Sequence, residues 1–578
     1  MASENKINWQ EWSKNAFDQA RVQNKPMIIN VGHEGCIACR WMKDETFSES
    51  GVIEIINKNF VAIQVDSEMR PDIGERYSDW AWPATAFNKP DGTQVLAIRG
   101  NRQPDDFKKI LNKILNDHLS GKLKADQLAP YAAPVKIRNT PLIQIRNQVR
   151  AQLDNSFDDK QGGWGSNKIL EHAEPIIQFA TRYHLENDKR ALYRFMKTAD
   201  GFMHHIDEVW GGIFYESLDN WDDLIFEKRL ETQASALQLF STAYEITREK
   251  RFIVALDHIQ RYLNEHLRSE SNLYFASQQA NIYNPSKEIS LPNYYDLDDE
   301  NRREIGLPSI DRSLYADLNG RVISGLVYAY EATGKTEYLT NAIRTAKALI
   351  KHHKINDTYF IQFKQNAEFR TDERVHKVLE NNTIYLRPHA YLGIAFVDLH
   401  RATANKHWLI QAQSVVNVLK NLQDNSLGGF FATKNQIIPR KPLEDNATAA
   451  RFLYMMSVLK KESEYHDMAE KAIRASASKS IVEREGRITG NLAEATELLT
   501  AGYLEFSIVG NKNDPAAQKL FETSRQVYEP RKILHFEQPG RYPKRDKAAL
   551  YICNIQACSV PIYDAININK EVGKFLDM

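Results

Sequence analysis

The chain has 578 residues, which is too long for a single ordinary hydrophobic core, so two or more domains are expected. Lys plus Arg and Asp plus Glu number 75 each, and the resulting net charge of zero gives no general attraction to nucleic acid or to an anionic membrane. No apolar run approaches the roughly 18 residues that a membrane span needs, so no membrane span is expected.

The N-terminus bears on the compartment. Residues 1–6 lack the apolar core of a signal peptide. As the chain stands, this predicts a cytoplasmic protein. A chain whose signal peptide had been removed would read in the same way, and it would be periplasmic or secreted.

Residues 8–120 alternate between helical and strand-like patterns. Helices are expected over 9–22 and 103–119, and a turn signal lies at 90–93. Apolar runs of strand length lie at 27–31, 60–66, 82–87 and 95–100. The run Cys36-Ile37-Ala38-Cys39 follows the first strand and opens a helix. Strand, CxxC, helix, proline-bearing strand and hairpin is the order of an α/β thioredoxin fold.

The spacing of the two cysteines has a chemical reason. Two intervening residues let the thiols meet across the first turn of a helix, where amide groups and the macrodipole stabilise the thiolate of Cys36. We therefore expect Cys36 to attack a disulfide and Cys39 to resolve the mixed disulfide. Pro83 stands where this fold places a cis-proline against the dithiol. Cys36, Cys39 and Pro83 are the predicted catalytic site.

A zinc site is the alternative use of a CxxC motif. Its second half is missing, because Cys553 and Cys558, the only other cysteines, have four residues between them, which is wide for a zinc knuckle. A redox pair is favoured over a structural metal and over an inert dithiol. No metal and no cofactor are therefore expected.

Several motifs match a known family. They are Gly35-Cys36-Ile37-Ala38-Cys39-Arg40-Trp41-Met42, Glu45-Thr46-Phe47, residues 59–66, Arg70-Pro71-Asp72-Ile73 and Trp82-Pro83, then Phe226-Glu227-Lys228, residues 312–317 and residues 550–561. Together they resemble the thioredoxin-domain proteins that carry a glycosidase-like helical barrel, which include the spermatogenesis-associated thioredoxin-like proteins of animals. Arg70-Pro71-Asp72 is the most telling element, because ordinary thioredoxins lack it. The resemblance spans nearly the whole chain.

The chain also departs from that family. The family usually has His before Phe-Glu-Lys, where this chain has Ile225, and Tyr-Asp further on, where this chain has Glu231-Thr232. The middle of the chain is shorter than usual. These changes bear on any inherited sugar chemistry and leave the dithiol untouched.

Residues 150–530 repeat one helical unit. An apolar helix ends, a polar turn follows and an outer helix begins. The residues that mark this slot are Tyr183, Tyr244, Tyr330, His400, Ser457 and Phe506. Six such pairs predict an all-α (α/α)6 toroid resembling six-hairpin glycosidases and N-acylglucosamine epimerases, with an open α-solenoid as the alternative.

Three domains follow from these patterns. They are a thioredoxin-like domain over 1–125, the (α/α)6 barrel over 126–531 and a C-terminal segment over 532–578 packed on the body. Cys553 and Cys558 in the last segment form a disulfide or remain free thiols. A structural role is favoured for them, and exchange with Cys36/Cys39 is the alternative.

Polar residues gather at the starts of the predicted inner helices, which converge on one funnel. The candidate pocket residues are Glu227, Glu231, Asp317, Asn319, Arg387, His389, Asp445, Asn446 and Glu494. Such donors and acceptors are what a sugar pocket needs. The same residue types are favoured at helix starts as caps and dipole partners, so the prediction rests on their convergence.

Three functions remain open. The first is a thiol–disulfide oxidoreductase whose barrel recognises a protein client or a sugar. The second is a carbohydrate epimerase or hydrolase, with Glu231 and Asp317 as acid and base and His389 as a proton carrier unless it is a satisfied core histidine. The third is a binding scaffold without activity. The expected partner is a protein thiol or disulfide client or a carbohydrate.

Overall fold

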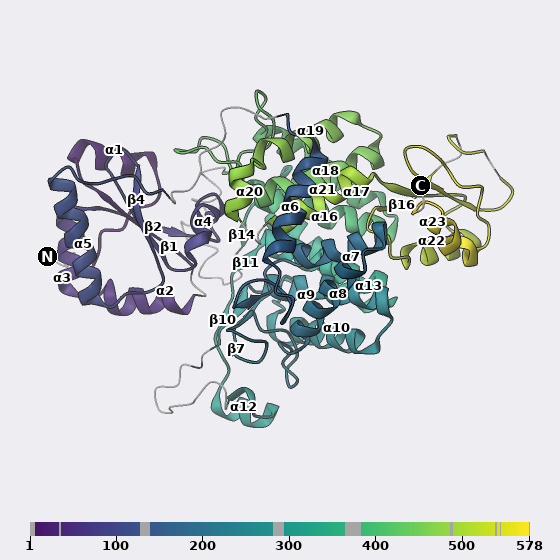
Figure 1. Cartoon of the computed structure of the whole chain (residues 1–578). Helices are drawn as coiled ribbons and strands as arrows, with labels where there is room; N and C mark the ends of the chain where they lie inside the picture. Colours follow the sequence, from purple (N-terminus) through teal and green to yellow (C-terminus); the bar gives the residue numbers. More distant parts are fainter. Residues whose placement is uncertain are drawn as a thin grey trace. The chain divides into compact units, whose positions relative to one another are not determined.

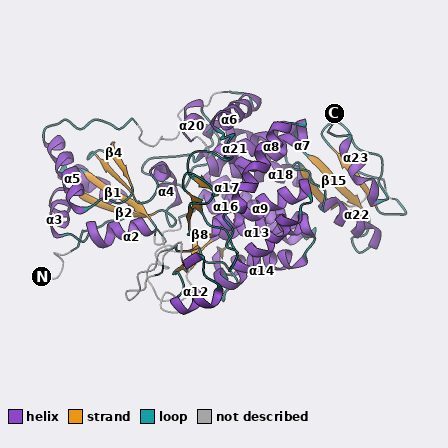
Figure 2. Ribbon diagram, turned by 60° about the horizontal axis from the view of Figure 1, so that its bottom comes forward, coloured by secondary structure: helices purple, strands orange, loops and turns teal. Residues whose placement is uncertain are grey.

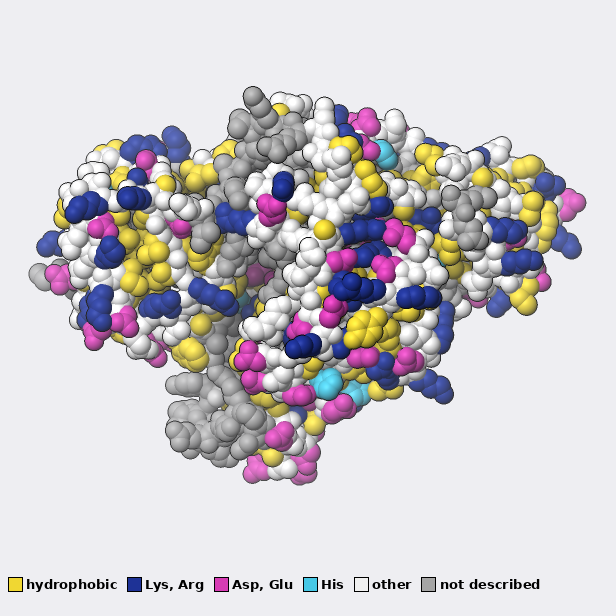
Figure 3. Space-filling view, viewed as in Figure 1, with side chains coloured by type: hydrophobic (Ala, Val, Ile, Leu, Met, Phe, Trp, Pro, Cys, Tyr) yellow, Lys and Arg dark blue, Asp and Glu magenta, His cyan; other side chains and the backbone are white. Residues whose placement is uncertain are grey.

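The computed structural model describes residues 6–33, 36–127, 139–280, 282, 294–363, 383–485, 489–537, 540–543 and 545–576. The chain divides into two compact units, residues 1–133 with 432–442, and residues 134–431 with 443–578 (Figure 1). Within the described ranges, no helix has the length and apolar character needed to cross a bilayer. On the face drawn in Figure 3, basic and acidic side chains are interspersed, in keeping with the zero net charge.

The first unit contains a four-stranded sheet in the order β2-β1-β3-β4 (Figure 2). Its strands are β1 (Met27–Gly32), β2 (Val61–Asp66), β3 (Ala84–Asn88) and β4 (Gln94–Arg99). β1 runs parallel to β2, with Ile29 opposite Ile63, and antiparallel to β3, which pairs antiparallel with β4. This is the thioredoxin-like sheet that the sequence predicts.

Helices cover both faces of this sheet. They are α1 (Lys14–Gln23), α2 (Ile37–Trp41), α3 (Ser50–Asn59), α4 (Pro71–Tyr77) and α5 (Pro104–Leu119). Phe17 of α1 and Ile73 of α4 share one core cluster with Ile29, whereas Phe107 of α5 packs with Ile28 in the other cluster. The alternation of side chains along β1 therefore supplies both cores.

The second unit is built on a closed ring of six inner helices. These are α7 (Glu174–Glu186), α9 (Leu230–Thr247), α13 (Ala316–Thr333), α16 (Leu386–Thr403), α18 (Leu443–Lys460) and α21 (Gly490–Ala501). Each contacts the next, and α21 contacts α7. Ring closure excludes the open solenoid and confirms the predicted (α/α)6 toroid.

An outer layer surrounds this ring. It consists of α8 (Lys189–Met203), α10 (Lys250–Tyr262), α14 (Thr336–His353), α17 (Lys406–Leu422), α19 (Ser463–Ser476) and α6 (Leu142–Ser156). The first five follow the inner helices on which they pack, whereas α6 precedes the ring and packs on α21. The outer layer is thereby closed by the helix at the beginning of the unit.

The repeated sequence slot is a helix C-terminal turn. Arg248, Gly334 and Ala404 follow three inner helices in the left-handed conformation. Each donates its N–H to the carbonyl four residues earlier, at 2.8, 2.8 and 2.7 Å respectively, which closes the helix. The sixth slot is wrong: Phe506 lies on a strand, because α21 already ends at Ala501.

Connections from outer to inner helices carry short paired strands and small helices. They are β5 (Lys168–Ile169), β6 (Glu216–Ser217), β7 (Leu224–Ile225), β8 (Lys228–Arg229), β9 (Ser277–Gln278), β10 (Ile310–Asp311), β11 (Leu314–Tyr315), β12 (Lys354–Ile355), β13 (Thr358–Tyr359), β14 (Gln362–Phe363), α12 (Asp299–Ile305) and α20 (Lys479–Glu485). Of these strands, β8 and β11 directly precede the inner helices α9 and α13.

The C-terminal part of the second unit is a three-stranded sheet with two helices. It consists of β15 (Leu504–Val509), β16 (Lys532–Glu537), β17 (Ala549–Cys553), α22 (Pro515–Arg525) and α23 (Ile568–Gly573), in the strand order β16-β15-β17. Phe506, Leu520 and Ile568 share its buried core. The predicted tail is thus the end of a small α/β layer that begins at Leu504.

Candidate functional site

The dithiol lies between the end of β1 and the start of α2. Cys36 is the N-cap residue of α2, and its Sγ accepts the N–H of Cys39 at 3.1 Å. The two cysteines form a disulfide with their Cα atoms 5.3 Å apart. Cys36 is buried and Cys39 is half-buried. The helix start thus directs an amide at the Cys36 sulfur.

Close packing defines the other side of the disulfide. A methyl group added at Gly32 would stand 2.6 Å from Cys39 Sγ and 3.9 Å from the Cα of Pro83. The Trp82–Pro83 peptide bond is cis. The structure therefore brings Gly32, Cys39 and Pro83 together, and only a residue without a side chain fits at the end of β1.

Arg70-Pro71-Asp72 serves the fold of this unit. Arg70 donates to both carboxylate oxygens of Asp72, at 2.9 and 2.8 Å, and to the carbonyl of Trp12 at 3.3 Å. Pro71 takes the first position of α4, where its missing N–H costs nothing. The motif thereby ties the segment after β2 to the chain before α1.

The second candidate site is the rim formed by the N-terminal ends of the inner helices. The second residue of each of five inner helices is polar. These residues are Glu231, Asp317, Arg387, Glu444 and Asn491. Three of them are in the predicted pocket, and Glu444 is the main residue that the sequence analysis missed.

Arg321 connects the charged groups of the rim. Its guanidinium contacts the carbonyl of Glu171, His172 Nδ1 at 3.2 Å and Ser235 Oγ at 3.1 Å. It also lies 3.9 Å from Glu231. His172 Nε2 is 3.2 Å from a carboxylate oxygen of Glu444. An acid, a histidine and its carboxylate partner thus surround one arginine.

The remaining contacts extend this network around the ring. Tyr391 donates its hydroxyl to Glu444, and Asn491 lies 3.4 Å from that hydroxyl. Arg387 donates to Asp445 at 3.3 Å. Helices α16, α18 and α21 meet through these groups.

Burial shifts the protonation of the rim. Burial, assisted by the nearby Glu171, raises the pKa of Glu231, and burial also raises the pKa of Asp317 against the pull of Arg387. Burial acts on His172 and Glu444 too, but their mutual attraction dominates, so the pKa of His172 is raised and that of Glu444 is lowered. The rim therefore holds a carboxyl group with a raised pKa, that of Glu231, beside the ion pair of His172 and Glu444.

The fourth residue of an inner helix has a different task. Asn319 receives the N–H of Tyr274 at 2.8 Å and donates to its carbonyl at 3.0 Å. Asn446 makes the same pair of bonds to Phe430, at 2.8 and 2.9 Å. His389 accepts the N–H of Tyr359 at 3.1 Å, and its other nitrogen faces the Tyr385 carbonyl at 2.7 Å.

Three predicted pocket residues therefore hold loops to the ring. The side chains of these three residues, Asn319, His389 and Asn446, form hydrogen bonds with backbone groups. Gln233, which was not predicted, does the same: its side-chain oxygen and nitrogen each bond to the backbone of Ile213 at 2.8 Å. Burial lowers the pKa of His389 to about 4, which keeps its imidazole neutral. The alternative of a satisfied core histidine describes His389.

Two further predicted residues lie away from this centre. Glu227 pairs with Arg229 at 2.9 Å, just before α9. Glu494 lies one turn into α21, where burial raises its pKa to about 7 and Thr181 donates to it at 3.3 Å. Asp445 stays at the rim as the partner of Arg387.

Two cavities adjoin the rim. One, with about 20 Å³ of free volume, is lined by Arg321, Tyr391 and Arg451 among others. A second, with about 40 Å³, lies beside His172 and is walled by Trp164 and Trp221. Each has room for a water-sized molecule between the side chains as they stand.

Within the described ranges, one group, Glu505, His535 and Glu537, has the spacing of a metal site. Arg541 already lies 2.6 Å from Glu505 and supplies the positive charge there.

The N-terminal 127 residues match the family model Thioredox_DsbH, a protein of unknown function, DUF255. The chain is also 22% identical to spermatogenesis-associated protein 20 of Rattus norvegicus, with 98% of this chain and 89% of that protein covered. This confirms the predicted resemblance. The similarity to spermatogenesis-associated protein 20 includes both the dithiol unit and the helical ring.

Solved structures with a similar helical region include two sugar enzymes. The cellobiose 2-epimerase from Bacillus thermoamylovorans B4167 is 10% identical with a TM-score of 0.46, over 58% of this chain and 86% of that one. A D-mannose isomerase is 13% identical with a TM-score of 0.45, over 62% of this chain and 99% of that one. The assignment of the toroid itself rests on the closed ring of helices.

Proposed function

We propose that Cys36 and Cys39 exchange electrons with the thiols or disulfides of a protein client. The observation that supports this is the place of Cys36 Sγ at the N-cap of α2, where it accepts the Cys39 N–H. In the reduced protein, the same amide and the helix dipole would stabilise a Cys36 thiolate. Cys36 then attacks the client, and Cys39, one turn later, breaks the mixed disulfide.

The test is dithiol-dependent reduction of insulin by the full chain. Cys36→Ser is expected to abolish turnover. Cys39→Ser is expected to accumulate a covalent adduct through Cys36, because the resolving thiol is gone. A double variant, Cys553→Ser with Cys558→Ser, is the control and should keep the activity. A wild type that reduces insulin no faster than Cys36→Ser contradicts the proposal.

As a second function, we propose that the rim binds a carbohydrate and moves a proton on it. The specific observation is that Glu231 and His172 both approach Arg321, at 3.9 and 3.2 Å. Because its pKa is raised, Glu231 can hold a proton and donate it, while His172 is oriented by Glu444. Arg321 would stabilise negative charge that develops on a substrate oxygen between them.

The side chains that line the cavity beside His172 suit the same class of ligand. Trp164 and Trp221 offer flat apolar faces, and Lys168 and Glu171 add polar groups to the same wall. Sugars combine apolar ring faces with hydroxyl groups, so they need both kinds of surface. A pyranose is therefore the ligand that this lining supports best.

Solvent deuterium exchange tests this second function. The full chain is incubated in D2O with aldoses, ketoses and disaccharides, and NMR follows deuterium at the carbon next to the carbonyl. Glu231→Gln and His172→Asn are expected to lower exchange at least about a hundredfold, the usual loss for an acid–base group. Glu337→Gln on the exposed face of α14 is the matched control. If no sugar shows deuterium exchange and no sugar binds, this second function is refuted.

A further inference from the structure

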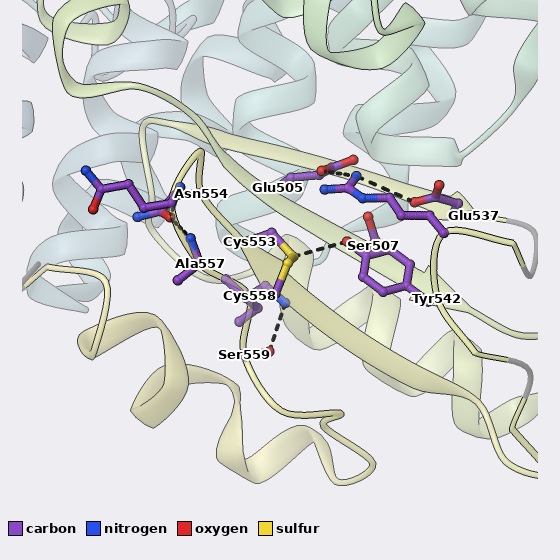
Figure 4. Close-up of a disulfide and its surroundings, with 12 residues drawn as sticks. Glu505, Ser507, Glu537, Tyr542, Cys553, Asn554, Ala557, Cys558 and Ser559 are labelled. Atoms are coloured by element: carbon purple, nitrogen blue, oxygen red, sulfur yellow. Dashed lines mark hydrogen bonds and ion pairs between the residues drawn. A yellow bond between two sulfur atoms is a disulfide. The ribbon is translucent and has the colours of Figure 1, made fainter.

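The second disulfide of the chain, Cys553–Cys558, is chemically asymmetric. Cys553 ends β17 and has no exposed surface, whereas Cys558 is exposed. Figure 4 shows the two sulfur atoms bridging the short turn after the strand. An incoming thiolate can therefore reach the Cys558 sulfur, and Cys553 is the sulfur that must leave.

The turn is held without the disulfide. Asn554 donates to the Ala557 carbonyl at 2.9 Å, and its side-chain oxygen accepts the N–H groups of Gln556 and Ala557 at 2.8 Å each. Ser559 is bonded to Ile552 in both directions, at 2.7 and 3.0 Å. Opening the disulfide therefore leaves the hairpin in place, as a reversible redox pair requires. A short loop fixed in this way also gains little from a covalent link.

A phenol faces the buried sulfur. The Tyr542 hydroxyl lies 3.1 Å from Cys553 Sγ, and the Tyr542 ring stacks on Tyr551 with centroids 4.2 Å apart. Stacking fixes this hydroxyl whether or not the disulfide is closed. Burial raises the pKa of Tyr542, so the group keeps its proton and can donate to a thiolate on Cys553.

Apolar side chains flank the exposed sulfur. Ile555 lies within the turn and Val560 follows it, and they are 82% and 69% exposed. Tyr563 and Ile566 add exposed apolar surface in the next residues. A protein thiol approaching Cys558 would meet an apolar border, which favours a protein over a small hydrophilic thiol as the reaction partner.

We propose that Cys553–Cys558 is a second redox-active disulfide, which accepts two electrons from a CxxC-type protein dithiol. A thiolate of the donor attacks Cys558 Sγ, forming a mixed disulfide and breaking the Cys553–Cys558 bond. The bonding pair leaves on Cys553 as a thiolate that accepts the Tyr542 O–H and then takes up a proton. The donor's second thiolate attacks the donor sulfur, releasing Cys558. The donor ends as a disulfide, and Cys553 and Cys558 end as thiols.

The first experiment isolates this pair from the dithiol of the other unit. The full chain with Cys36→Ser and Cys39→Ser is equilibrated with graded dithiothreitol, alkylated and weighed intact. We expect reversible reduction with an unchanged circular dichroism spectrum, and alkylation of Cys558 at least about tenfold faster than that of Cys553 because only Cys558 is exposed. A pair that stays oxidised until the protein unfolds, or that alkylates with no difference between the two, overturns the proposal.

Tyr542→Phe tests the leaving group. It keeps the stacked ring and removes the hydroxyl, so reduction by dithiothreitol should slow at least about fivefold, as the loss of a hydrogen bond to a charged group implies. Tyr551→Phe is the matched control, since it removes the hydroxyl from the other ring of the stacked pair, whereas the contact with Cys553 comes from Tyr542. Equal rates for the two variants overturn the assigned role of Tyr542.

The donor class is tested with two variants of this chain. Reduced protein with Cys553→Ser and Cys558→Ser is mixed with oxidised protein carrying Cys36→Ser and Cys39→Ser. Mass spectrometry should show two electrons passing from the first to the second. If dithiothreitol reduces the pair but this mixture does not react, the CxxC donor is refuted. Insulin reduction by the first variant shows separately whether its own dithiol is active.

Discussion

Two reciprocal substitutions on α13, one from carboxylate to amide and one from amide to carboxylate, test the different roles of the second and fourth residues of an inner helix. Asp317→Asn changes the second residue of the helix, which faces the axis. Asn319→Asp changes the fourth, which holds the loop at Tyr274. Both substitutions preserve side-chain shape, and both native residues are buried. We nevertheless expect a large loss of stability from Asn319→Asp and little change from Asp317→Asn.

The structure gives the size of each effect. The Asn319 amide group donates to the carbonyls of Tyr274 and Tyr315 at 3.0 and 2.9 Å. A carboxylate there removes the side-chain donor of the buried Tyr274 carbonyl, at about 1–3 kcal/mol, places negative oxygens against the Tyr315 carbonyl and adds a buried charge. We expect about 4 kcal/mol of destabilisation or more at pH 7. Asp317→Asn instead removes a poorly solvated charge and should stay within about 1 kcal/mol of the wild type.

Urea unfolding of the full chain at pH 7 and pH 5 measures both variants. The loss from Asn319→Asp should shrink at the lower pH, because a protonated carboxyl can again donate one hydrogen bond. Circular dichroism reports the helical transition, and the matched substitution controls for the chemistry of the change. Equal losses for the two variants, or a larger loss for Asp317→Asn, would refute the assignment of these two positions.

Three further predictions concern other parts of the chain. Gly32→Ala should destabilise the first unit by about 1–3 kcal/mol, because the new methyl group stands 2.6 Å from Cys39 Sγ; thermal unfolding with the disulfide intact measures this. His535 and Arg541 hold the pKa of Glu505 at about 2 despite its burial, so its stabilising contribution is present above about pH 4.5 and is lost as pH falls toward 2; acid unfolding should show a weaker pH dependence in Glu505→Gln. Burial raises the pKa of Glu494 to about 7, so this group makes the fold less stable as pH rises from about 4.5 to 7; Glu494→Gln should stabilise at pH 8 and not at pH 4.

Much of the fold was within reach of sequence patterns. The strand predicted at 27–31 is β1 (Met27–Gly32), and the closing helix predicted over 103–119 is α5 (Pro104–Leu119). The helix predicted from residue 9 begins only at Lys14, because Gln10 pairs beside Ile63 of β2 and Ser13 caps the helix. Helix α3 was missed, although Val52, Ile53 and Ile56 show helical spacing.

The inner helices were found because their C-terminal turns look alike. The sixth lacks that turn: α21 has 12 residues, against 18 in α9, and passes through Gly502 directly into β15. Because α21 is followed by the strand β15, no outer helix begins after it. The polar slot with an aromatic marker therefore has no counterpart there, and the match at Phe506 was a coincidence of composition.

The rim was predicted at the correct ends of the helices, but the sequence did not show which residues at each helix start share a face. Residues two apart on a helix differ by about 200° in direction, so Asp317 and Asn319 cannot both face the axis. Residues four apart on a helix share a face, and Arg321 and Tyr391, which lie four residues after Asp317 and Arg387, line the cavity. Once a helix start is fixed, its second and sixth residues are the ones to assign to the pocket. Glu444 would then have replaced Asn446 in the prediction.

Buried polar atoms without a partner distinguish some residues of the rim and its cavity from the residues that hold loops. Among the described residues, Asp317 Oδ1, Asn491 Oδ1, Thr448 Oγ1 and Arg451 Nε are buried and have no hydrogen-bond partner within the protein. Folded proteins rarely leave such atoms unpaired, because each costs about 1–3 kcal/mol. The loop-holding residues Asn319 and Asn446 do not share this feature, since their side chains are bonded to backbone groups. Within α13 and α18, the fourth residue is thus bonded to a loop, whereas Asp317 and Thr448 keep a buried polar atom that has no partner within the described protein.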